Sequence, residues 1–149
     1  MSKEARRAVV AALIELAGSP DFQDRADAGR SLASFAEDPD ARRRLLGLVL
    51  DTEDTFVTRV TTVALLRRQD AAGLRVVASA LAAADSNHAD WIHTAVLDVF
   101  MVFGRGRDAA VRECEMLIHD PDDHVRDGAA QLIDTLAEID PVLLPSRDG

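Results

Sequence analysis

A turn rich in acidic residues, followed by a helical segment, recurs four times along this chain of 149 residues. The turns are Ser19-Pro20-Asp21, Asp51-Thr52-Glu53-Asp54, Asp85-Ser86-Asn87 and Asp120-Pro121-Asp122. An arginine or histidine follows each of them, at Arg25, Arg59, His93 and Arg126, with spacings of 34, 34 and 33 residues. A period of this length indicates repeated supersecondary units that cover one another's apolar faces. The chain is therefore predicted to be an array of about four similar units.

The apolar residues between the turns repeat with the period of an α-helix. Ala, Val and Leu dominate the apolar 48% of the chain, and Ala and Leu are among the strongest helix formers. Helices are expected near residues 3–17, 21–36, 40–50, 54–69, 71–84, 89–103, 107–118 and 121–138. No segment of useful length alternates as a strand would, so the predicted fold class is all-α.

Proline marks three of the expected helix starts. Ser19-Pro20, Asp38-Pro39 and Asp120-Pro121 each place a capping side chain before a residue without a backbone N–H. The first helical N–H has no partner within the helix, so proline loses nothing there. Gly18 suits a helix C-cap, and Gly104-Arg105-Gly106 is expected to connect two helices.

The fourth unit resembles a known repeat family. Asp120-Pro121, followed by Val125-Arg126 and Ala129, matches the Asp-Pro…Val-Arg…Ala pattern of the HEAT-repeat family and its short bacterial relatives. The resemblance implies an α-solenoid of about four antiparallel helix pairs, a HEAT-like superhelix. Its units would span about 1–37, 38–70, 71–106 and 107–140 in a single domain, 1–141, with a C-terminal tail at 142–149. The Trp-Leu-Gly-Tyr pattern of tetratricopeptide repeats and the Thr-Pro-Leu-His signature of ankyrin repeats are absent.

The last helix also predicts its own packing. Its buried stripe is expected to contain Val125, Ala129, Leu132 and Leu136, which lie on one face. Small residues near Ala28, Thr62, Ala95 and Ala129 are expected to let neighbouring helices approach closely. The resemblance implies that the arginine at position 126 hydrogen-bonds carboxylates or carbonyls of the preceding turn.

The net charge of −9 is confined to the second half of the chain. Residues 1–75 hold 12 basic and 12 acidic side chains, whereas residues 76–149 hold 5 basic and 14 acidic ones. Such a surface repels nucleic acid and attracts basic partners over long distances. The alternative reading is that the charge only keeps the protein soluble.

The solvent side of the second helix of each unit is the predicted partner-binding face. Its candidate residues, mostly acidic, are Asp27, Arg59, Asp90, Thr94, Asp98, Asp127, Gln131 and Asp134. In solenoids of this kind that side usually lines the concave surface. The alternative is a merely solvated face.

The segment 89–103 has a second apolar stripe. Ile92, Ala95, Val96, Val99 and Phe103 form the expected core stripe, and His93, Leu97, Phe100 and Met101 form the other. Either this helix is buried on two sides, or Leu97 and Met101 form a patch for a partner or a homodimer. Trp91 beside the patch is either a binding hot spot or a side chain packed at the helix start.

Candidate catalytic and metal sites are weak. His88, Asp90 and His93 are metal-ligand types, but their helical offsets point apart, and no metal or cofactor is expected. Cys114, the single cysteine, is expected to be an inert buried thiol. The stretch 103–108, FGRGRD, lacks the third glycine and the preceding strand of a dinucleotide fingerprint.

Two arginine runs remain. Arg42-Arg43-Arg44 lies near a helix start and Arg67-Arg68 at a helix end. They are too few for a nucleic-acid groove. They are expected to be solvated, with a grip on an acidic partner or a phosphate as the alternative.

The sequence therefore predicts a non-enzymatic protein–protein interaction module with a basic protein partner. Alternatives are an immunity or antitoxin-like inhibitor of a basic toxin, a self-assembling subunit, and, by analogy within the family, a DNA glycosylase or lyase-type enzyme. The chain lacks an apolar run of the roughly 18 residues that a membrane span needs, so a cytoplasmic protein without nucleic-acid or membrane partners is expected.

Overall fold

The computed structural model describes residues 1–142 and is all-helical over that range. It contains α1 (Lys3–Ala17), α2 (Phe22–Leu32), a short 3-10 helix η1 (Ala33–Phe35), α3 (Pro39–Val49), α4 (Thr55–Arg67), α5 (Ala71–Ala83), α6 (Ser86–Phe100), α7 (Gly104–Leu117) and α8 (Asp123–Glu138). The predicted all-α class is confirmed.

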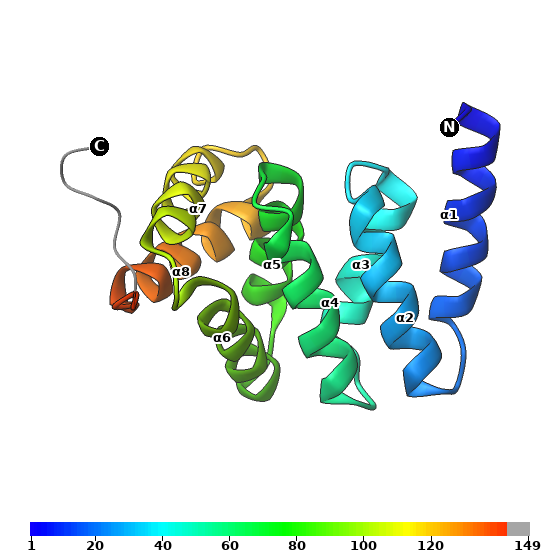
Figure 1. The fold of residues 1–149 in the computed structure, drawn as a ribbon, viewed down its shortest axis with the longest axis horizontal. Helices are drawn as coiled ribbons and strands as arrows, with labels where there is room; N and C mark the ends of the chain where they lie inside the picture. The colour runs from blue at the N-terminus through cyan, green and yellow to red at the C-terminus, as the bar shows by residue number, and fades with distance from the viewer. Residues whose placement is uncertain (143–149) are drawn as a thin grey trace.

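The helices form an elongated array that begins at α1 and ends at α7 and α8 (Figure 1). Within the array α1 packs on α2, α3 on α4, and α7 on α8. Neighbouring units meet through α2 with α4 and α4 with α6, while α1, α3, α5 and α7 contact one another in sequence order. The helices thus contact both their neighbours in the sequence and the helices two positions away.

The last helix departs from this pattern, because α8 packs along α5 and only touches α6. The close approach depends on Gly128: a Cβ at this position would lie 1.7 Å from the carbonyl oxygen of Ala78 in α5. The predicted stripe of Val125, Ala129, Leu132 and Leu136 is buried, as expected. The residue that admits the neighbouring helix, however, is the glycine beside Ala129.

Glycine has the same role between α2 and α4. A Cβ on Gly29 would lie 2.1 Å from the hydroxyl oxygen of Thr61. Ala28 and Thr62, where close approach was expected, are fully buried beside these two residues. The contact positions are therefore shifted by one residue from the predicted ones.

The helix caps agree with the prediction at one proline and differ at two. Asp38 caps α3 with Pro39 as its first residue, as predicted. At the other two turns the cap is the acidic residue after the proline, Asp21 for α2 and Asp122 for α8. Asp120 instead accepts the N–H of Asp122 at 2.9 Å, which orders the turn before the helix starts.

The boundaries of the third unit also differ. Helix α6 begins at Ser86 and ends at Phe100, three residues before the expected range at either end, because Asp85 caps it through the N–H of His88. Gly104-Arg105-Gly106 is not a connection, since α7 begins at Gly104. Phe103, expected in the core, is 61% exposed.

Candidate functional site

The outward stripe of α6 is open to solvent. Asp90, Thr94, Leu97, Asp98 and Met101 share this stripe, and all five are exposed. Leu97 and Met101 are 44% and 46% exposed, so the structure places them in a surface patch and not in a second core. The patch exists because α8 packs on α5 and leaves this side of α6 uncovered.

The end of α6 extends the apolar patch. Val102 and Phe103 follow Met101 directly, and their exposed fractions are 39% and 61%. Exposed apolar side chains that adjoin one another mark interaction surfaces more often than isolated ones do. We use "α6 patch" for Leu97, Met101, Val102 and Phe103.

Helix α8 presents an acidic stripe beside this region. Asp127, Gln131, Asp134 and Glu138 are all exposed and lie on one face of the helix. The hydroxyl of Thr135 lies 3.0 Å from Nδ1 of His93, which joins this part of α8 to α6. His93 is therefore half-buried, with Nδ1 of its ring in an interhelical contact.

The first half of the same face is not acidic, contrary to the expectation of a mostly acidic surface. A groove of about 290 Å³ runs along α4, with Arg30, Arg59 and Arg67 among its lining residues. Asp27 pairs with Arg30 at 3.0 Å, so its charge is offset locally. The candidate face is thus basic over α2 and α4 and acidic over α6 and α8.

Arg59 and Asp98 meet where these two regions join. Their side chains form an ion pair with an N–O distance of 3.2 Å between α4 and α6. Both side chains remain about half exposed, so solvent weakens the pair. Trp91 lies in the second turn of α6 and is half-buried, which leaves part of its ring available at the edge of this surface.

The recurring arginine has a structural role in the first and last units. Nη1 of Arg126 donates to the carbonyl oxygen of Asp120 at 2.7 Å, and Nη2 contacts Asp123. Nη1 of Arg25 donates to the carbonyl oxygens of Ser19 and Pro20 at 3.1 and 3.0 Å. The predicted hydrogen bonds from position 126 to its turn are confirmed.

Arg59 and His93 do not occupy the equivalent position. Arg25 and Arg126 follow their capping residues, Asp21 and Asp122, by four residues. Arg59 follows its cap, Asp54, by five, and one further residue turns a side chain about 100° around a helix. Arg59 therefore lies on the candidate partner-binding face, where it pairs with Asp98, whereas Arg25 folds back under its turn.

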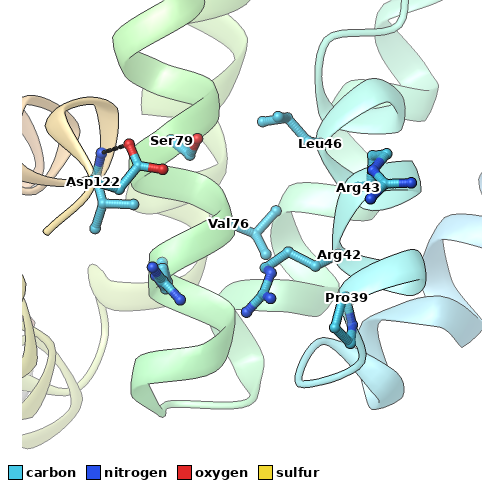
Figure 2. A pocket seen from close by; sticks show the side chains of 9 residues that line it. Pro39, Arg42, Arg43, Leu46, Val76, Ser79 and Asp122 are labelled. Carbon is cyan, nitrogen blue, oxygen red and sulfur yellow. Dashed lines mark hydrogen bonds between the residues drawn. The ribbon is translucent and has the colours of Figure 1, made fainter. Parts of the chain in front are cut away.

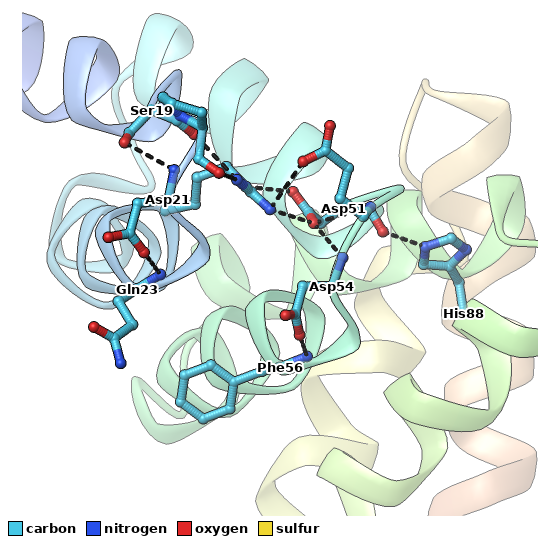
Figure 3. Close-up of polar contacts among 10 residues, drawn as sticks. Ser19, Asp21, Gln23, Asp51, Asp54, Phe56 and His88 are labelled. Carbon is cyan, nitrogen blue, oxygen red and sulfur yellow. Dashed lines mark hydrogen bonds and ion pairs between the residues drawn. The ribbon is translucent and has the colours of Figure 1, made fainter.

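Asp51 connects three successive units (Figure 3). Its carboxylate accepts hydrogen bonds from Nε and Nη2 of Arg25 at 3.0 and 3.3 Å, and both side chains are about nine-tenths buried. Its carbonyl oxygen lies 2.7 Å from Nε2 of His88 in α6. Sequence reasoning missed this contact, because it assigned His88 to a loop and Asp51 only to a turn.

The His88 ring is held between two acceptors. Nε2 faces the carbonyl oxygen of Asp51, and Nδ1 lies 2.8 Å from the carboxylate of Asp85. Only the doubly protonated ring donates to both, so these hydrogen bonds, the one to Asp51 foremost, raise the pKa of His88 against the opposing effect of burial. The backbone N–H of His88 and, after it, the His88 ring lower the pKa of Asp85, so this carboxylate stays ionised at neutral pH.

This arrangement predicts that stability falls as pH rises above neutrality. A folded pKa above the unfolded value of 6.5 adds stability that is fully present below pH 6.5 and is lost as pH rises through the folded pKa. Urea unfolding measured between pH 6 and pH 9 should show this loss in the wild type and much less of it in His88→Gln. The exposed His124 gives the matched control, and an equal effect of His124→Gln would contradict the assignment.

Within residues 1–142 no three His, Cys, Asp or Glu side chains are grouped closely enough to hold a metal ion. His88 contacts Asp51 in the turn between α3 and α4, whereas His93 contacts Thr135 in α8. No helix of the described range is long and apolar enough to cross a membrane.

Cys114 is fully buried in α7. Burial raises the pKa of its thiol to about 12, with a smaller effect from Glu113 and Glu115. We expect no reaction with a thiol reagent at pH 8 in the native protein, and a reaction of one thiol per chain in urea. Rapid native labelling, followed by mass spectrometry, would contradict this placement.

Comparisons with known proteins do not assign a family. No family model matches the sequence, and no curated protein matches it. Among solved structures it is similar to a crystal structure of an engineered protein, with 21% sequence identity and a TM-score of 0.35. The match covers 92% of this chain and 65% of that one, so the chain spans less than two thirds of the length of the protein it matches.

Proposed function

We propose that residues 1–141 form a HEAT-like α-solenoid of four helix pairs, which binds a basic protein partner and carries no catalytic activity. The contacts of α2 with α4 and of α4 with α6, together with those along α1, α3, α5 and α7, support the solenoid. The Ser19-Pro20 and Asp120-Pro121 turns, with Arg25 and Arg126 folded beneath them, support the HEAT-like pattern of the first and last units.

The observation that carries the proposal is the surface formed by α6 and α8. It combines the apolar α6 patch with exposed carboxylates at Asp90, Asp127 and Asp134. A partner that covers it must offer apolar side chains surrounded by lysine or arginine. Apolar contacts at the centre supply affinity, and the surrounding charges supply speed and specificity of association.

Charge reversal on α8 tests the proposed face. A partner is first captured from the native host and identified, and its association rate is then measured by stopped flow. Asp127→Lys with Asp134→Lys should slow association at least about tenfold at low salt, and the difference should shrink at high salt, because steering is screened. Glu4→Lys with Glu15→Lys changes the net charge equally on exposed positions of α1 and serves as the control.

An equal effect of the two charge reversals, or no effect of either, would contradict the proposed face. Identification of the partner as a toxin with a basic surface would select the immunity-protein form of this function. Tight binding of DNA at about 0.15 M salt would instead contradict a basic protein partner.

The α6 patch gives a second test, which separates a foreign partner from a second copy of the chain. Leu97→Asp with Met101→Asp should abolish partner capture without loss of helical signal, because both side chains are already exposed. Light scattering on the wild type distinguishes a foreign partner from a second copy. If the wild type is a dimer and these substitutions convert it to a monomer, the patch binds a second copy, which would contradict a foreign partner there.

A further inference from the structure

A second cleft lies between α3 and α5 and is also lined by the start of α8 (Figure 2). Its volume is about 310 Å³, and its walls include three arginines, Arg42, Arg43 and Arg75. Its accessible apolar residues are Pro39 and Leu46, whereas Val76 and Val125 lie beneath it and are almost fully buried. The volume falls within the range of small-ligand sites.

The arginines are only partly neutralised by the protein. Within residues 1–142, Arg42 has no carboxylate within 4.0 Å, and Arg43 has only Asp40 at 3.9 Å. Nη2 of Arg75 donates to Asp120 at 3.1 Å, which fixes that side chain against the turn before α8. Over the described residues the cleft therefore holds one guanidinium group, that of Arg42, without an ion-pair partner, in a protein whose net charge is −9.

Asp122, the acidic residue that lines the cleft, already accepts hydrogen bonds as the N-cap of α8. Its Oδ1 accepts the N–H groups of His124 and Val125 at 2.8 and 3.4 Å. Figure 2 shows Arg42 extending from α3 toward α5, close to Val76. The open cation thus lies next to an apolar wall, where water weakens an ion pair less than it does on an open surface.

We propose that this cleft binds a small phosphate monoester, with the phosphate between Arg42 and Arg75 and the organic part against Pro39 and Leu46. Guanidinium groups match oxyanions through paired N–H donors. A phosphate monoester has three terminal oxygens and nearly two negative charges at neutral pH, so it can bond arginines from two helices more strongly than a singly charged carboxylate does. The apolar wall favours an ester over inorganic phosphate.

Titration of the protein with phenyl phosphate, inorganic phosphate and benzoate tests the site. Two-dimensional NMR of the amide groups follows binding, and shifts should concentrate at Leu46 and Val76. Phenyl phosphate should bind at least about threefold more tightly than either of the other two, which corresponds to about 0.7 kcal/mol. Equal affinity for benzoate, or for inorganic phosphate, would overturn the assignment.

Arg42→Gln is the decisive variant, because this side chain makes no ion pair whose loss would unfold the protein. It should weaken phenyl phosphate at least about tenfold. Arg112→Gln, an exposed arginine of α7, is the matched control and should leave binding unchanged. No binding by the wild type at about 10 mM ligand, or equal weakening by both substitutions, would overturn the proposal.

Discussion

Replacing Gly128 with Ala is expected to lower the free energy of unfolding by about 3 kcal/mol. The new Cβ would lie 1.7 Å from the carbonyl oxygen of Ala78 and 2.7 Å from its Cα, so it meets backbone atoms that no side-chain rotation can move. Helices α5 and α8 would have to separate along their whole contact. Urea unfolding followed by circular dichroism measures the loss.

Whether Gly128→Ala lowers or raises the free energy of unfolding tests how closely α8 lies to α5. In an unconstrained helix, Gly to Ala stabilises by about 1 kcal/mol. Gly47, in α3, provides that case, because a Cβ there would meet no atom within 4 Å. Gly47→Ala should therefore raise stability while Gly128→Ala lowers it. A neutral or stabilising Gly128→Ala would mean that α8 does not lie this close to α5.

Replacing Arg25 with Met is expected to cost about 3 kcal/mol, because it leaves the carboxylate of Asp51 buried without its partner. The two side chains are 9% and 10% exposed, so little solvent screens them. Met retains the aliphatic volume of the arginine, and the loss therefore reports on the charge and its hydrogen bonds. The substitution also removes the hydrogen-bond donor of the carbonyl oxygens of Ser19 and Pro20.

A double-mutant cycle isolates the pair. Arg25→Met with Asp51→Asn should cost less than the sum of the two single changes, because each single variant buries an unpaired charge and the double variant buries none. Arg30→Met breaks the exposed pair with Asp27 and should cost no more than about 0.5 kcal/mol. Additive effects at positions 25 and 51, or an equal cost at position 30, would contradict a buried ion pair.

Much of the fold follows from local signals in the sequence. Asp38-Pro39 predicted the start of α3, and the period of the apolar residues predicted the buried stripe of α8. The N-caps of α2 and α8 were predicted two residues too early, at Ser19 and Asp120, because a residue that can cap a helix stands on either side of each proline. Which of the two residues caps the helix depends on the shape of the turn, and Arg25 or Arg126 fixes that shape through hydrogen bonds to the turn's carbonyl oxygens.

Less of the candidate site than of the fold could be predicted from the sequence. Its outward stripes on α6 and α8 were predicted, since helical spacing alone sets which residues share a face. Whether Leu97 and Met101 are buried could not be decided, because this depends on α8 lying on α5 and not along α6. That choice rests on the fit of Gly128 against the backbone at Ala78, which no local pattern reveals.

The contacts of Asp51 also determine how this molecule comes apart. Arrays of helix pairs can fray from their ends, since each unit is held only by its neighbours. Here one residue accepts hydrogen bonds from α2, in the first unit, and from α6, in the third. Loss of α2 would take the Arg25 guanidinium away from Asp51, and we expect this to loosen the turn whose carbonyl oxygen contacts His88, so that α2 and α6 come apart together and not one after the other.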